Sequence, residues 1–112
     1  MSAKHFPYWV AGEATISGVA TEIRNPFDGR IVGTVFEAAS EHVDAAIEAS
    51  AAVADEFAGT PAHVRSDALV HVSTRLHERR EEIARLISAE SGKPIKWARV
   101  EVARAVSTFR WA

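Results

Sequence analysis

The sequence has no cysteine among its 112 residues. Disulfides, thiolate zinc sites and a cysteine nucleophile are therefore excluded within these residues. Long apolar runs are absent as well. No stretch approaches the roughly 20 residues that a membrane-spanning helix needs, and the N-terminus lacks the apolar segment of a secretory signal. We therefore expect a cytoplasmic location.

A strong excess of charge of either sign is also missing. The formal net charge is −2, with 13 Lys and Arg residues and 15 Asp and Glu residues interspersed along the chain. This balance gives no electrostatic reason to expect a nucleic acid or a membrane surface as partner. An apolar fraction of 47% with 25% charged residues is typical of a soluble globular protein, and the length fits one small domain.

The usual patterns of an active site are not found either. His42, His63, His71 and His77 lack the spacing and the accompanying acids of a helical zinc site, so we expect surface histidines. No serine has the glycine-flanked elbow that activates a nucleophile. Lys93 does not belong to a phosphate-binding loop, because the residues around it depart from that pattern. The sequence therefore assigns no catalytic and no cofactor-binding residue.

Up to about residue 38 the sequence predicts short strands. Gly12, Gly18 and the Asp28-Gly29 pair separate β-prone segments, and Asp-Gly tolerates the positive φ of a tight reversal. Few large apolar residues occur here, so these strands need each other or a larger sheet. The region 1–38 is predicted as β-hairpins, with strands at 8–10, 14–17, 21–24 and 31–36.

From residue 39 to 112 the apolar spacing changes to that of helices. Four helices are predicted. The first has Ser40 as N-cap and ends at Gly59; the second has Thr60 as N-cap and a proline at its first position. The charged block 78–82 predicts a bend, the third helix ends at Gly92, and the fourth starts near Pro94. We expect the four apolar faces to share one core.

The fourth helix has two further features. Trp97 lies off its apolar stripe, so we expect this side chain to face a second layer of protein. Arg99, Glu101, Arg104 and Arg110 are candidates for ion pairs along the helix. The helical pattern still continues at Ala112, from which we expect the chain to be part of a longer protein.

The corner formed by residues 90–94, Glu-Ser-Gly-Lys-Pro, is the most informative segment. Glu90 lies seven residues after Ile83 and three after Ile87, so on a helix it projects from the apolar stripe. Its carboxylate either stays half exposed at the helix end or takes a cation, an arginine or backbone N–H groups as partners. Gly92 fits the left-handed position that ends a helix, and Pro94 fits the start of the next one.

The order of these signals resembles the N-terminal part of the aldehyde dehydrogenase superfamily of NAD(P)-dependent oxidoreductases. The resemblance runs along nearly the whole chain. An Asn-Pro-x-x-Gly turn alone is common, but its combination with the Glu-x-Gly-Lys-Pro corner about 65 residues later is specific. The segments that carry the resemblance are 25–35, 43–47, 65–69, 90–94, 101–102 and 108–110.

The resemblance implies that residues 1–112 open a Rossmann-like cofactor-binding domain of α/β class, mainly helical in this part, within a subunit of several hundred residues. Family members oxidise an aldehyde to a carboxylic acid with NAD or NADP through a cysteine thioester. The catalytic cysteine, its base, the oxyanion asparagine and the cofactor turn would all follow Ala112. The resemblance therefore predicts an inactive fragment of a homo-oligomeric enzyme whose aldehyde substrate stays open.

The resemblance also implies one candidate metal site. Some family members hold a structural monovalent cation with backbone carbonyls just before the Asn-Pro turn and an acid at the corner. These ligands map to Ile23, Arg24 and Glu90. Oxygen ligands suit such an ion, but a salt bridge from Glu90 to an arginine is equally natural.

A second function from another class is open at this point. The chain could be a free-standing helical module that docks on a partner and catalyses nothing. Under either hypothesis, we expect other protein to bury the apolar side chains near the C-terminus, Phe109 and Trp111. An open reading frame that continues into a cysteine-bearing segment with a Rossmann pattern would favour the enzyme.

Overall fold

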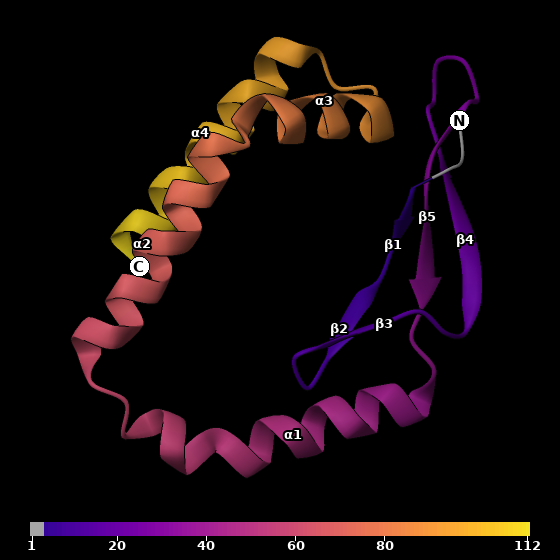
Figure 1. Cartoon of the computed structure of the whole chain (residues 1–112). Coiled ribbons are helices and arrows are strands. Elements are labelled where there is room, and N and C mark those ends of the chain that lie inside the picture. Colours follow the sequence, from indigo (N-terminus) through magenta and orange to yellow (C-terminus); the bar gives the residue numbers. More distant parts are fainter. Residues whose placement is uncertain (1–3) are drawn as a thin grey trace. The chain divides into compact units, whose positions relative to one another are not determined.

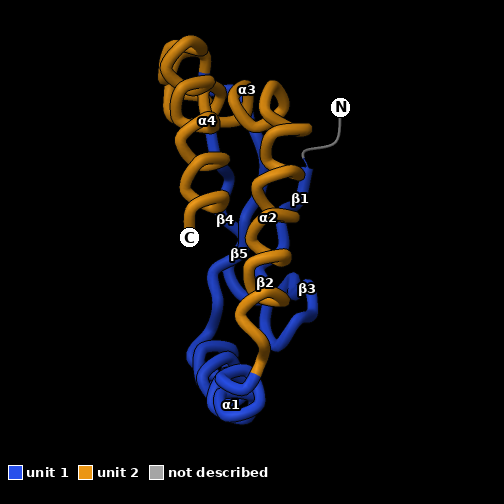
Figure 2. Tube along the Cα trace, turned by 90° about the vertical axis from the view of Figure 1, so that its left-hand side faces the viewer, with its two compact units in different colours: residues 1–24, 29–59 blue, residues 25–28, 60–112 orange. Residues whose placement is uncertain are grey.

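The structure is a computed structural model that describes residues 4–112, and within them five short strands are followed by four helices (Figure 1). The predicted order of strands and then helices is confirmed, with the change between Glu37 and Ser40. The chain forms two compact units (Figure 2). Among the described residues, unit 1 comprises 4–24 and 29–59, and unit 2 comprises 25–28 and 60–112.

Unit 1 contains a three-stranded sheet of β1 (His5–Phe6), β5 (Ile31–Glu37) and β4 (Val19–Arg24), in the order β1-β5-β4. The β4–β5 pair is antiparallel, as the Asp-Gly turn predicts, and β1 runs parallel to β5. β1 was not predicted, because two residues carry no periodicity and their pairing partner lies far along the sequence.

The second sheet of unit 1 is a two-stranded hairpin of β2 (Tyr8–Val10) and β3 (Glu13–Thr15). Val10 pairs with Glu13, so only Ala11 and Gly12 form the loop. Both loop residues have positive φ, 50° at Ala11 and 84° at Gly12. Positive φ at both positions is the geometry of the type I′ turn, whose twist matches that of the strands. Alanine is an unusual residue at the first of these positions.

The helix α1 (Ser40–Ala58) completes unit 1 and contacts β2. Its N-cap is Ala39, without a side-chain cap, so the assignment of Ser40 as N-cap is wrong by one residue. α1 contains no buried residue; Ile47 is 61% exposed and Phe57 60% exposed. The prediction that four helices share one core is therefore wrong, because α1 belongs to unit 1 and its apolar stripe is open.

Unit 2 is built from α2 (Ala62–Glu78), α3 (Arg80–Ser91) and α4 (Ile95–Trp111). Arg79 alone separates α2 from α3, which places the predicted bend inside the charged block. Pro61 is the N-cap of α2 rather than its first residue, and no side chain caps this helix end. Thr60 is therefore not the N-cap. The shift arises because Pro61 has an extended ψ of 142°.

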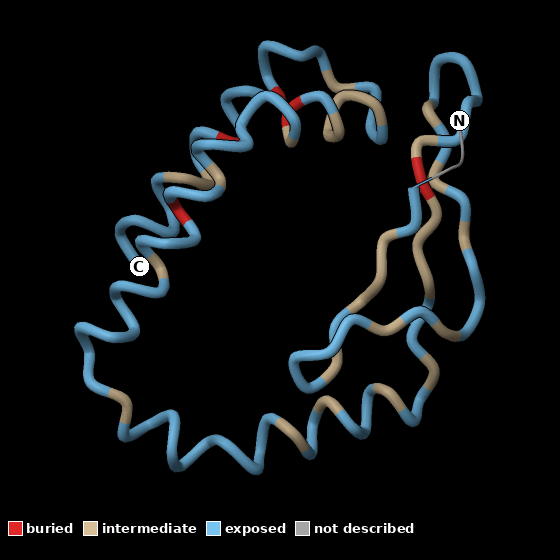
Figure 3. Tube along the Cα trace, viewed as in Figure 1, coloured by how far each residue is buried: buried red, intermediate tan, exposed pale blue. Residues whose placement is uncertain are grey.

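The core of unit 2 lies where α3 and α2 pack against α4 (Figure 3). Ala84 and Ala98 are fully buried and Val102 is 2% exposed, with Ile83 and Ile87 packed against them. Small side chains at Ala84 and Ala98 let two helix backbones approach closely, because no bulky group stands between them. This core contains few large side chains.

A buried serine ties α2 to α4. Ser73, 4% exposed, donates a hydrogen bond from Oγ to the backbone carbonyl of Val106 at 2.8 Å. The bond satisfies a polar group that would otherwise be costly to bury. None of the helices among the described residues combines the length and the apolar character needed to cross a membrane.

The Ala11 turn gives a prediction of stability. Ala11→Asn should stabilise unit 1 by about 0.5–1 kcal/mol, because asparagine accepts positive φ more readily than alanine does. Urea denaturation followed by Trp9 fluorescence, in a W97F/W111F background, measures this change. Ala11→Val is the opposite control, since a β-branched side chain should destabilise the same position. An unchanged or lowered stability of Ala11→Asn would contradict the assigned turn.

Candidate functional site

The corner at residues 90–94 is a network of local hydrogen bonds within unit 2. The Gly92 N–H donates to the carbonyl of Ser88 at 3.0 Å, and Ser88 Oγ donates to the carbonyl of Lys93 at 2.7 Å. Ser91 Oγ donates to the carbonyl of Ile87 at 2.7 Å and accepts from the Lys93 N–H at 3.3 Å. These hydrogen bonds satisfy carbonyl groups at the end of α3 and backbone groups of the turn. They thereby fix the direction of α4 relative to α3.

Gly92 has a φ of 70°, the left-handed conformation predicted for a helix-ending glycine. Pro94 is the N-cap of α4, and its carbonyl accepts hydrogen bonds from the N–H groups of Trp97 and Ala98. A Cβ on Gly92 would lie 3.0 Å from Cγ of Pro26. The Asn-Pro turn therefore packs directly on the corner, and glycine leaves room for it. Asn25 Oδ1 shapes this turn by accepting the Phe27 N–H at 2.8 Å.

Glu90 lies in the last turn of α3 and is exposed, although its spacing placed it on the apolar stripe. Because the side chain is exposed, its carboxylate is not desolvated in this structure. Ile23 and Arg24 belong to β4 in unit 1, at a register irregularity between the two residues on an edge strand. An edge strand leaves backbone carbonyls outside the sheet's hydrogen bonds, which suits carbonyl ligands. The cation site of Ile23, Arg24 and Glu90 stays a prediction.

The arginines of α4 pair differently from the predicted pattern. Arg99 forms a two-pronged ion pair with Glu81 of α3, with Nε–Oε1 and Nη2–Oε2 distances of 2.9 and 3.0 Å. Glu101 pairs with Lys93 of the corner, not with Arg104. The hydrogen bond from Arg99 lowers the pKa of Glu81, and the same bond raises the pKa of Arg99. These pairs connect elements, whereas spacing within one helix reveals only pairs along it.

Unit 1 contains a polar chain that the sequence did not reveal. The hydroxyls of Tyr8 and Ser17 are 2.8 Å apart, and Ser17 Oγ lies 3.2 Å from His42 Nε2. The rings of Tyr8 and His42 meet edge to face at 5.7 Å. His42 is half-buried, so its prediction as a surface histidine is wrong, whereas His63, His71 and His77 are exposed as predicted. No signal in the sequence links residues so far apart.

The Ser17–His42 contact does not make a nucleophile and base. His42 Nδ1 is buried and has no hydrogen-bond partner among the described residues, so an acid that orients the imidazole is missing there. Within residues 4–112 no group of three His, Asp or Glu side chains is placed to hold a metal ion. The polar contacts join the β2–β3 hairpin to α1 in unit 1 and α3 to α4 in unit 2.

Comparison with models of known protein families shows to which family the chain belongs. The family model described as "Aldehyde dehydrogenase family" matches residues 9–112. This match includes the Asn-Pro turn and the corner that it contacts. The chain belongs to the aldehyde dehydrogenase family, as its motifs indicated.

Individual relatives give the same picture. Aspartate-semialdehyde dehydrogenase 1 of Pseudomonas canavaninivorans is 37% identical over 89 residues, which are 80% of this chain and 19% of that protein. Aldehyde dehydrogenase 21 of Physcomitrella patens, solved with its product succinate, has a TM-score of 0.93 and 32% identity over 98% of this chain and 23% of its own. The α-ketoglutarate semialdehyde dehydrogenase of Haloferax volcanii is 33% identical over 92% of this chain and 21% of its own length.

The chain spans about a fifth of the length of the curated relatives that it matches. Solved relatives include an NAD-dependent enzyme and one in complex with NADP, so homologues bind either cofactor. The residues that the structure describes contain neither a glycine-rich turn that opens a helix after a strand nor a cysteine.

Gly92 provides a test of the corner. Gly92→Ala should destabilise unit 2 by about 1–2 kcal/mol, because alanine is strained at positive φ and its Cβ meets Pro26. Gly59→Ala is a matched control at the end of α1, where φ is −77° and the added Cβ has only ordinary contacts. Urea denaturation followed by circular dichroism measures both changes. Equal effects of the two substitutions would contradict a special role of the corner.

The Glu81–Arg99 pair predicts a pH dependence. Because the pKa of Glu81 is lowered in the folded chain, its contribution to stability is complete above the unfolded pKa of about 4.3 and is lost as the pH falls through the folded pKa. Glu81→Gln should therefore be less stable than the unsubstituted chain at pH 7 but equally stable in strong acid. Glu90→Gln is the control, because it removes an exposed carboxylate from the same helix without touching the Glu81–Arg99 pair. Thermal unfolding at low salt is the measurement; a Glu81→Gln deficit that persists in acid would rule out the ion pair as its source.

Proposed function

We propose that this chain is the N-terminal part of an aldehyde dehydrogenase subunit that oxidises an aldehyde to a carboxylic acid with NAD or NADP. The observation that carries the proposal is the continuous match over residues 9–112 to a family whose curated relatives are about five times longer. The relatives named aspartate-semialdehyde, lactaldehyde and vanillin dehydrogenases differ in substrate, so the proposal names aldehydes as a class.

The chemistry is proposed to lie outside these 112 residues. A cysteine beyond Ala112 would form the thioester, and the cofactor would accept the hydride. This chain's residues would contribute the opening strands and helices of the cofactor-binding domain, with the corner at Gly92 holding α3, α4 and the Asn-Pro turn together. We further propose a cytoplasmic homo-oligomer, with neither nucleic acid nor membrane as partner.

The cation site belongs to the same proposal. Ile23, Arg24 and Glu90 would hold a structural monovalent ion in the complete subunit. A heavier monovalent ion soaked into crystals of that subunit should give an anomalous peak beside Glu90, and the peak should vanish in Glu90→Gln. An arginine paired with Glu90, without a peak, would replace the ion by a salt bridge.

The function is tested on the complete open reading frame and on residues 1–112 alone. The complete product should reduce NAD or NADP when it is given an aldehyde from a panel of semialdehydes, lactaldehyde and aromatic aldehydes. It should lose this activity when the proposed cysteine is changed to serine, and residues 1–112 alone should be inactive.

Two results would contradict the proposal. The first is aldehyde oxidation by the 112-residue chain itself, because the chain has no cysteine. The second is a reading frame that stops at Ala112, with a chain that binds a partner and catalyses nothing. That result would favour the helical interaction module, for which the exposed side chains of Trp97 and Trp111 are the supporting observation.

A further inference from the structure

A hollow in unit 2 lies where the end of α2 and the start of α3 meet the middle of α4. It measures about 300 Å³ and is lined by His77, Arg80, Glu81, Arg99, Ala103 and Val106. This volume is at the lower end of the range of small-molecule sites in proteins. An apolar wall with a few polar groups is the usual composition of such a site, and the side chains of Ala103 and Val106 supply the wall.

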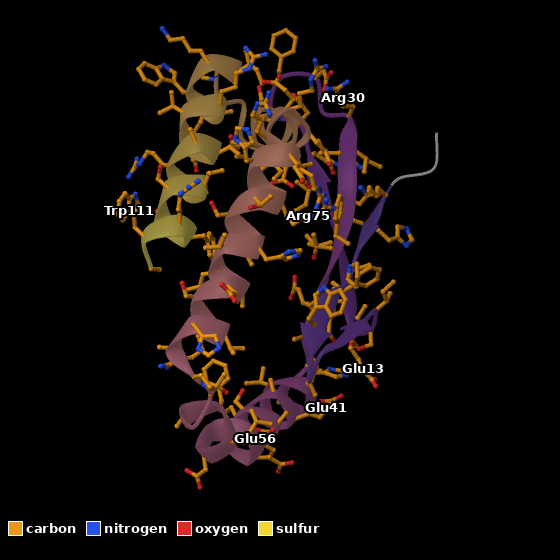
Figure 4. All side chains as sticks on the ribbon, turned by 60° about the vertical axis from the view of Figure 1, so that its left-hand side comes forward. Glu13, Arg30, Glu41, Glu56, Arg75 and Trp111 are labelled. Atoms are coloured by element: carbon orange, nitrogen blue, oxygen red, sulfur yellow. The ribbon has the colours of Figure 1, made fainter. Side chains whose placement is uncertain are left out.

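One positive charge at the hollow has no carboxylate partner. Each glutamate of the block 78–82 pairs with an arginine of its own; the pairs are Glu78–Arg75, with Arg75 labelled in Figure 4, Glu81–Arg99 and Glu82–Arg79. Arg80 belongs to the same block but forms no ion pair among the described residues. Its Nη1 donates a hydrogen bond to the backbone carbonyl of His77 at 3.2 Å. The Nε and Nη2 groups of Arg80 are therefore available to a ligand.

Arg99 is held in a fixed orientation beside the hollow. Its Nε and Nη2 donate to the two carboxylate oxygens of Glu81, at 2.9 and 3.0 Å. The N–H groups on Nη1 have no hydrogen-bond partner within the part of the chain that the structure describes. A planar guanidinium matches the geometry of a carboxylate and binds it through charge-assisted hydrogen bonds. Arg80 and Arg99 thus offer free donors to an anion.

The apolar wall decides between an inorganic and an organic anion. Inorganic phosphate would leave Ala103 and Val106 uncovered. Glu81 also lines the hollow and repels a doubly charged anion more strongly than a singly charged one. A carboxylate that carries an apolar group can pair with the arginines and at the same time remove apolar surface from water. The lining therefore fits a singly charged organic anion best.

We propose that this hollow binds a small organic carboxylate. The carboxylate accepts hydrogen bonds from the free N–H groups of Arg80 and Arg99, and the apolar group lies on Ala103 and Val106. Glu81 is a positioning residue, because it orients Arg99 and has no donor to offer the ligand. The site goes beyond the proposed dehydrogenase function and does not depend on it.

The test uses the complete product of the open reading frame that contains this chain. Benzoate is the probe, benzamide is its neutral counterpart, and acetate lacks the apolar ring. Calorimetry at constant ionic strength should show benzoate binding at least about tenfold more tightly than either of the other two. Absence of benzoate binding, or equal binding of benzamide, would overturn the proposal. Inorganic phosphate that binds more tightly than benzoate would overturn the organic carboxylate as the ligand class.

Two substitutions change the hollow in different ways. Arg80→Gln removes the unpaired charge and should weaken benzoate binding at least about fivefold. Ala103→Leu fills the hollow without changing its charge and should weaken binding by a similar factor. Both residues are exposed, so neither substitution disturbs the core of unit 2. Unchanged benzoate binding in both variants would rule out this hollow as the site.

Arg85→Gln is the matched control. Arg85 is exposed on α3 and forms no ion pair among residues 4–112, but it does not line the hollow. This variant removes the same charge as Arg80→Gln and should bind benzoate within about twofold of the unsubstituted protein. Equal weakening by the two arginine substitutions would indicate a general attraction of anions and would overturn the site.

Dehydrogenase activity measured on the same samples separates this proposal from the proposed function. Benzoate binding that Arg80→Gln and Ala103→Leu weaken, in a protein without activity, contradicts only the proposed function. Aldehyde oxidation by a protein whose benzoate binding is insensitive to both substitutions contradicts only the carboxylate site.

Discussion

The left-handed turn at Gly92 is the constraint on which unit 2 depends. It reverses the chain within three residues, so that α4 runs back against α3 and α2. Only this reversal brings Ala98 against Ala84 and places the Val106 carbonyl within reach of Ser73. The missing Cβ has a second consequence, because the Pro26 ring occupies the space beside the glycine. One residue thus sets a helix direction and anchors a turn that is distant in the sequence.

The local chemistry of the sequence was sufficient to predict most elements. The glycine at 92, the charged block at 78–82 and the Asp-Gly pair act through their own backbone, so their effect is readable without the fold. The N-caps predicted at Ser40 and Thr60 were each misplaced by one residue, because a capping residue is defined by its backbone conformation and not by its type. β1 was missed because its two residues derive their conformation from β5.

Contacts between distant residues were beyond the sequence. Whether a residue is buried depends on which other element packs against its side of the helix. The periodicity of the sequence shows which side is apolar, but it does not show what packs there. The α1 stripe and the α4 stripe are equally regular, yet only the latter is buried in this chain. The ion pair of Arg99 with Glu81 and the chain from Tyr8 to His42 join different elements in the same way. The corner at residues 90–94, by contrast, was predicted correctly because its hydrogen bonds join residues that are close in the sequence.

The segments that identify the family, the Asn-Pro turn and the corner, contact one another and hold secondary structure in place. Neither supplies a nucleophile, and the whole sequence contains no cysteine. A scaffold of this kind is constrained by backbone geometry, which tolerates few residue types at Gly92, whereas a substrate pocket changes with each substrate. It follows that these two segments identify the family of the chain but do not identify a substrate.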